Sequence, residues 1–150
     1  HGLETVEFMI TTNAGHPPQP LTKIASGGEL SRISLAIQVA TIGYSTIPTL
    51  IFDEVDVGIG GGVAEIVGSL LRQLGEQRQI LCVTHLPQVA AQAHNHLRVE
   101  KESGDNGSWT SITPLDEEKR VVEIARMLGG VELTQTTLDH AREMIFKTAS

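Results

Sequence analysis

The chain has 150 residues, which fits one domain, and 40% of them are hydrophobic, enough to build a core. Because only 3% are aromatic, that core must be aliphatic, and a formal net charge of −7 excludes a surface that attracts nucleic acid as a whole. No stretch approaches the roughly 18 apolar residues of a membrane span, no signal-peptide pattern opens the chain, and the single cysteine cannot form an internal disulfide. We therefore expect a soluble cytoplasmic protein, and a start without methionine is typical of a piece of something longer.

The first forty residues predict one strand and one helix. Residues 6–11 alternate in the period of a half-buried strand, and the prolines that follow end regular structure. Between residues 30 and 40 the apolar residues return at helical spacing. They are Leu30, Ile33, Ile37 and Ala40, with Leu35 and Ala36 beside them.

Ser26, Gly27, Gly28 and Glu29 stand at the start of this helix. A serine followed three residues later by a glutamate is a capping box, which is a sufficient reason for a helix to begin here. Capping does not explain the paired glycines, which remove Cβ atoms at a helix mouth where backbone N–H groups point outward. Because such an end favours an anion, the segment predicts a phosphate contact, with simple capping as the alternative.

Residues 48–54, Pro-Thr-Leu-Ile-Phe-Asp-Glu, form the centre of the pattern. The uninterrupted apolar run predicts a strand buried on both faces, as in a parallel sheet, and the strand ends at Asp53 and Glu54. Ligands of open α/β sheets bind beyond the carboxyl ends of strands, where two adjacent carboxylates repel each other unless a cation or proton lies between them. The alternative is a strand that happens to end in an acidic turn.

A second strand and its crossover helix follow the acidic pair. After a glycine-rich loop, a helix is expected over residues 63–74 with Gly75 as its C-cap, and the apolar run of residues 79–84 predicts another strand. Strand, helix and strand form a crossover unit, so the two strands should be parallel neighbours. The second strand ends at Thr84 and His85, which places His85 at the same sheet edge as the acids, as a phosphate contact.

The rest of the chain predicts helices and a hairpin. His94 and His96 follow a short helix over residues 86–93, and they lack further metal ligands nearby, so we interpret them as loop residues. The remaining expected elements are strands at residues 97–101 and 109–113, and helices at residues 116–128 and 134–147.

The order of these features resembles the C-terminal half of an ABC-type ATPase head. Residues 26–29 look like the signature motif, and residues 50–53 look like Walker B, with Glu54 as the catalytic glutamate. Asp56 stands in a D-loop-like segment, and His85 matches the switch histidine.

Three longer stretches of sequence show which ATPase family the chain resembles. Residues 24–32, 51–61 and 84–90 are very similar to the bacterial DNA-repair members of the SMC-like family. The fold that this implies is α/β, a mainly parallel sheet flanked by helices, forming the C-terminal lobe of a P-loop NTPase head whose N-terminal lobe is missing. Residues 1–150 would be the C-terminal half of one SMC-like head domain.

The resemblance implies ATP and Mg²⁺ as ligands. Asp53 would hold the metal ion, Glu54 would position or deprotonate the attacking water, and His85 would contact the γ-phosphate. The implied activity is ATP hydrolysis in double-strand break repair.

A second set of residues is implied to bind nucleotide across a dimer. Ser26 and the N–H groups of Gly27 and Gly28, within the motif that Glu29 completes, would grip ATP bound to another head. Asp56 would lie near the dimer seam.

One motif of the family is absent from the chain. No G-x-x-x-x-G-K-[ST] occurs in it, and no heptad run for a coiled coil, so we expect no ATPase activity from this chain alone. The implied partners are an N-terminal half-head with Walker A, a second head in an ATP-dependent homodimer, and DNA through the whole protein. No membrane partner is implied, and the expected location is cytoplasmic, at the nucleoid.

Two other functions share these motifs. The cassette of an ABC transporter, or another SMC-like head, has the same order of elements, although transporters usually carry Gln where this chain has Glu29. A non-enzymatic assembly module on an inactive ATPase fold is the second alternative, and the intact Asp53, Glu54 and His85 argue against it.

Overall fold

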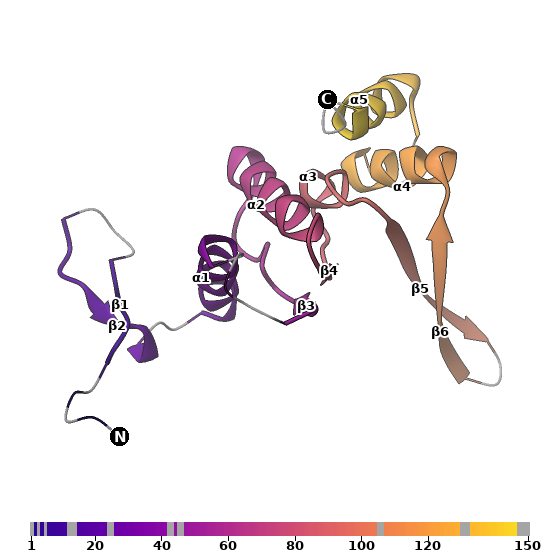
Figure 1. Ribbon diagram of the computed structural model, residues 1–150. Coiled ribbons are helices and arrows are strands. Elements are labelled where there is room, and N and C mark those ends of the chain that lie inside the picture. The colour runs from indigo at the N-terminus through magenta and orange to yellow at the C-terminus, as the bar shows by residue number, and fades with distance from the viewer. Residues whose placement is uncertain are drawn as a thin grey trace.

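Helices and strands alternate through the middle of the chain, between residues 27 and 104, and a pair of strands precedes this part (Figure 1). The computed structural model describes residues 2, 4, 6–11, 15–23, 26–41, 44, 47–104, 107–129 and 133–146. Its elements are, in order, β1 (Met9–Ile10), β2 (Gln19–Pro20), the 3-10 turn η1 (Leu21–Lys23), α1 (Gly27–Ala40), β3 (Thr49–Phe52), α2 (Gly61–Gly75), β4 (Gln79–Cys82), α3 (Pro87–Ala90), β5 (His96–Gly104), β6 (Gly107–Leu115), α4 (Glu117–Gly129) and α5 (Gln135–Phe146).

The N-terminal strand is shorter and more exposed than predicted. β1 and β2 form an antiparallel pair of two residues each. Val6 and Phe8 precede this pair and are 84% and 67% exposed. The predicted half-buried strand over residues 6–11 is therefore wrong, because so short a ladder offers no packed face for these side chains.

Helix α1 begins where the Ser26 cap predicts, with Ser26 as its N-cap. Leu35 is almost fully buried against the core below α2, whereas Leu30 and Ile37 are exposed. Spacing alone identified the helix, and the buried face is decided by α2, which packs on the side of α1 that carries Leu35.

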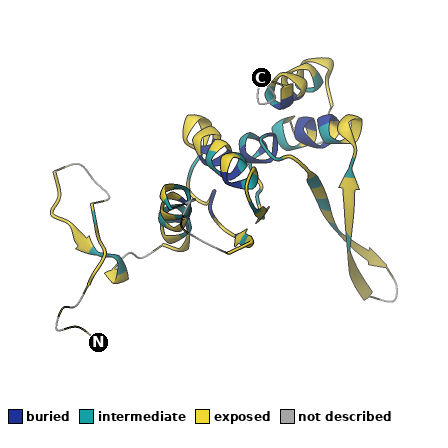
Figure 2. Cartoon of the chain, in the orientation of Figure 1, coloured by how far each residue is buried: buried dark blue, intermediate teal, exposed yellow. Residues whose placement is uncertain are grey.

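β3 and β4 are parallel neighbours connected by α2, which confirms the predicted crossover unit. The register pairs Thr49 with Gln79 and Phe52 with Cys82. Phe52 packs in the core with residues of α1 and α2, whereas Ile51 is 70% exposed. The buried parts of the chain lie mainly along α2, α3 and α4 (Figure 2). The predicted burial of this strand on both faces is therefore wrong for this chain, since helices cover only one face of the pair.

The C-terminal third is a hairpin followed by two packed helices. β5 and β6 pair antiparallel along nine residues each, longer than predicted, and the turn at residues 105–106 lies outside the described residues. α3 ends at Ala90, earlier than the predicted helix over residues 86–93. α4 packs against α5, and the predicted end of the last helix at residue 147 also lies outside the described residues.

Two hydrophobic cores lie among the described helices and the β3–β4 pair, and both are nearly all aliphatic, as the composition predicts. The first lies between α1, α2 and the β3–β4 pair, and contains Leu35, Phe52, Val55, Ala64, Val67, Leu71, Leu74 and Val89. The second joins α3, α4 and α5, and contains Ala90, Ala91, Val121, Ile124, Ala125, Ala141 and Ile145. Of the three ladders described, only β3–β4 is parallel, so this part of the chain holds a parallel pair and no larger parallel sheet.

Candidate functional site

The serine half of the predicted capping box is formed at the start of α1, and the Glu29 carboxylate bonds to the Ser26 hydroxyl rather than to its backbone N–H. The Ser26 hydroxyl accepts a hydrogen bond from the Glu29 backbone N–H at 3.2 Å and donates one to the Glu29 carboxylate at 2.8 Å. Ser26 and Gly27 remain exposed at the helix mouth. The observed cap explains why the helix starts here. The helix mouth is exposed, so a phosphate can reach it, and the phosphate contact stays a prediction.

Asp53 and Glu54 leave β3 at its carboxyl end, as predicted, and both are exposed. The Glu54 backbone N–H donates to Asp53 Oδ1 at 3.0 Å. Glu54 has a φ of 57°, and it is the one non-glycine residue with positive φ in the described part of the chain. A glutamate in this left-handed region is strained, and strained residues cluster at functional sites.

The helix mouth of α1 and the acidic turn are in contact. A Cβ atom on Gly27 would lie 2.8 Å from Glu54 Oε2, and one on Gly28 would lie 3.1 Å from the carbonyl oxygens of Glu54 and Val57. Gly28 is buried. The second glycine therefore has a structural reason to be there, because any side chain would press on the backbone of the turn.

Asp56 is buried between the ends of β3 and β4, with 2% of its surface exposed. Its Oδ2 accepts hydrogen bonds from the Thr84 hydroxyl at 2.5 Å and the His85 backbone N–H at 3.1 Å, and His85 Nδ1 lies 3.4 Å away. The His85 side chain itself is 71% exposed. Asp56 thus fixes His85 at the surface, while its own contact with a nucleotide stays a prediction that would need this loop to move.

Thr84→Val tests how much the buried carboxylate depends on its hydroxyl partner. Valine keeps the shape of the side chain but leaves Asp56 Oδ2 short of one donor, so we expect a loss of about 1–3 kcal/mol in the free energy of unfolding. Urea unfolding measures it. Thr110→Val, the same change on an exposed part of β6, should stay within about 0.5 kcal/mol; equal losses for the two variants would show that Asp56 does not need Thr84.

Cys82, at the end of β4, is not a reactive group of this site. Burial, with further contributions from Asp56 and Asp53, raises the pKa of its thiol to about 12. The thiol therefore stays protonated near neutral pH and is a poor nucleophile or metal ligand.

Asp53 is the predicted metal ligand, and its surroundings fit Mg²⁺. Its carboxylate is exposed at a strand end, and Mg²⁺ in nucleotide sites uses one or two carboxylates together with substrate phosphates. The described residues contain no cluster of three or more His, Cys, Asp or Glu that could hold a metal by themselves. The donor set thus suits an ion that arrives with a phosphate ligand rather than one caged by protein alone.

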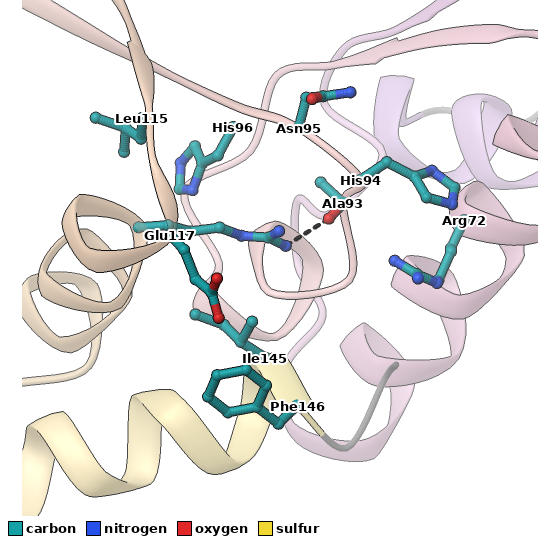
Figure 3. A pocket seen from close by; sticks show the side chains of 10 residues that line it. Arg72, Ala93, His94, Asn95, His96, Leu115, Glu117, Ile145 and Phe146 are labelled. Carbon is teal, nitrogen blue, oxygen red and sulfur yellow. Dashed lines mark hydrogen bonds between the residues drawn. The ribbon is translucent and has the colours of Figure 1, made fainter. Parts of the chain in front are cut away.

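A cavity of about 370 Å³ lies away from these residues, between α2, α4, α5 and the start of β5 (Figure 3). Its cations are bound to the chain's own backbone: Arg120 donates to the carbonyl of Ala93 at 2.5 Å, and Arg72 donates to that of Gln92 at 2.8 Å. Burial, and then the charge of Arg120, lowers the pKa of His96 at the same place. None of the predicted site residues lines this cavity, which is a junction between helices.

Three hydrogen bonds at the acidic turn come from two residues to which the sequence analysis assigned no role. The Ser31 hydroxyl donates to the Asp53 carbonyl at 3.0 Å. Arg32 Nη1 donates to the carbonyls of Val57 at 2.8 Å and Val55 at 3.4 Å. Their place directly after the Ser-Gly-Gly-Glu segment was the available signal, but helical periodicity shows them only as polar positions.

Several known proteins that are similar to this chain have the same name, DNA repair protein RecN. No family model matches the chain. The DNA repair protein RecN of Xylella fastidiosa is 61% identical over 135 residues, covering 90% of this chain and 24% of that protein. RecN of Haemophilus influenzae is 58% identical over 145 residues, with 97% and 26% covered, and RecN of Bacillus subtilis is 44% identical over 144 residues, with 96% and 25% covered. The chain therefore spans about a quarter of the length of the curated relatives it matches.

A solved structure gives the fold independently. It is described as "Structural biochemistry of ATP-driven dimerization and DNA stimulated activation of SMC ATPases", and it matches with a TM-score of 0.54 at 22% identity. The match covers 79% of this chain and 70% of that one.

In the part of the chain that the structure describes, no helix has both the length and the apolar character to cross a membrane.

Proposed function

We propose that residues 1–150, which match RecN along nearly the whole of this chain, are the C-terminal half of an SMC-like ATPase head that acts in DNA double-strand break repair. The half-head would supply the signature motif, Walker B, the D-loop and the switch histidine. The structural observation that carries the proposal is the parallel β3–β4 pair, whose carboxyl ends hold the acids and His85 together. Strand ends of this kind are where open α/β sheets bind ligands.

Three residues do the chemistry in this proposal. Asp53 binds the Mg²⁺ that accompanies ATP, an ion that neutralises phosphate charge when bound. Glu54 orients the attacking water and accepts its proton, which its exposed carboxylate allows. His85, positioned through Asp56, hydrogen bonds the γ-phosphate.

The exposed face of the parallel pair supports an N-terminal half-head as partner. Ile51, Leu81 and Val83 are 70%, 43% and 64% exposed, although they belong to or adjoin the two central strands. Apolar strands of a parallel sheet are normally covered on both faces. The N-terminal lobe, with Walker A, would cover this face and extend the pair into a mainly parallel sheet.

A second head is the other proposed partner. Ser26 and the N–H groups of Gly27 and Gly28, in the motif that Glu29 completes, would contact the γ-phosphate of ATP held by the opposite head, which makes dimerisation depend on ATP. Asp56 would lie near that seam and act through His85. DNA would be bound by the whole protein, in the cytoplasm at the nucleoid, without a membrane partner.

Phosphate release by the purified chain tests this division of labour. We expect none above background, because no P-loop in the chain cradles the phosphates. Addition of a purified N-terminal half-head should restore turnover, and the same mixture made with Glu54→Gln should stay inactive. Robust turnover by the chain alone would contradict the proposal.

A further inference from the structure

The loop after β3 is held from outside by α1. Residues 53, 55 and 57 each present a backbone carbonyl to this helix, which supplies the Ser31 hydroxyl to the first and the Arg32 guanidinium to the other two. The described residues place no carboxylate within 4.0 Å of Arg32. Arg32 is thus committed to the backbone of this loop rather than to an ion pair.

The loop needs such support. Two backbone hydrogen bonds within the loop are long, at 3.2 Å from Val57 N–H to the Glu54 carbonyl and 3.4 Å from Ile59 N–H to the Asp56 carbonyl. Glu54 stands in a strained backbone conformation, which persists only where surrounding contacts impose it. Gly28 completes the contact, since its missing Cβ lets α1 approach the loop.

Taking the ATPase head proposed above as given, we propose that Arg32 is a positioning residue that clamps the loop carrying Glu54 and Asp56 to the N-terminus of α1. The same helix end would contact nucleotide on the opposite head. If α1 shifts when it contacts that nucleotide, the backbone carbonyls of Val55 and Val57 move with it. The Glu54 carboxylate, which belongs to the chain's own site, then moves as well. Hydrolysis in one composite site is coupled in this way to nucleotide in the other.

Arg32→Met in the full-length protein removes the donors and keeps an unbranched side chain that suits a helix. Misplacement of a catalytic group by about 1 Å can cost about 10²-fold, so we expect kcat to fall by about that factor, with little change in ATP binding through the P-loop. The Hill coefficient for ATP should fall toward 1. Amides of residues 54–59 should exchange hydrogen faster, measured by mass spectrometry.

Two variants separate positioning from loss of fold. Arg32→Lys keeps a cationic donor without the guanidinium geometry, and should recover part of kcat and part of the exchange protection. Arg142→Met, on the exposed side of α5, removes an arginine that pairs with Asp139 and should behave like the wild type.

The outcomes distinguish this clamp from the ATPase proposal. Wild-type kcat and Hill coefficient in Arg32→Met, while Glu54→Gln is inactive, would overturn the clamp and leave the ATPase head standing. Unchanged exchange at residues 54–59 would overturn the clamp whatever the activity. If Glu54→Gln hydrolyses ATP normally, the proposed ATPase role of this site fails, and the exchange data alone decide whether Arg32 holds the loop.

Discussion

Glu54→Gln in the full-length protein is expected to stop ATP hydrolysis while ATP binding persists. Glutamine keeps the shape of the side chain and can keep the same backbone conformation, and Asp53 remains available to Mg²⁺. The amide cannot accept a proton, and the loss of a general base typically costs about 10²–10⁴-fold in rate. ATP-bound dimers should accumulate because they form but do not turn over.

Single-turnover hydrolysis, nucleotide binding and sizing with ATP measure these three effects. Glu143→Gln, an exposed glutamate on α5, is the matched control and should hydrolyse ATP like the wild type. Normal turnover by Glu54→Gln would show that Glu54 is not the base. Loss of ATP binding as well would point instead to a structural role at the contact between Glu54 and Gly27.

Ser26→Arg in the full-length protein is expected to abolish ATP-dependent dimerisation and hydrolysis in a folded protein. The substitution removes the observed cap, at a cost of about 0.5–2 kcal/mol, and places a bulky side chain where the opposing nucleotide must approach. Each head should still bind ATP through its own P-loop. If Ser26 were a cap alone, activity would fall only as far as stability does, and both would recover on cooling.

Two further samples sharpen the Ser26 experiment. Ser26→Ala loses the cap without adding bulk, so its thermal midpoint gives the contribution of capping by itself. A mixture of Ser26→Arg with a P-loop mutant forms dimers in which one composite site has both parts intact, and it should regain activity that neither mutant shows alone. A folded Ser26→Arg protein that dimerises normally with ATP would leave only the helix cap.

Local signals in the sequence were enough to locate the helices and strands that carry the candidate site. The capping box located the start of α1, and the apolar runs around Leu50 and Leu81 located β3 and β4, with α2 as the crossover between them. These predictions held because capping, periodicity and strand runs act among residues close in the chain. The positions of Asp53 and Glu54 at a strand end followed from the same local pattern.

Burial and long-range contacts depended on how the elements pack. Alternation and spacing could not show that Ile51 faces outward in this chain, or that α1 buries Leu35 and leaves Leu30 exposed, because the neighbouring element determines which face is buried. Nor could they show that Asp56 points inward to Thr84, or that Arg32 holds the loop 23 and 25 residues further along the chain. Such contacts join segments that are distant in the sequence, and they exist only once the β3–β4 pair and α1 have come together.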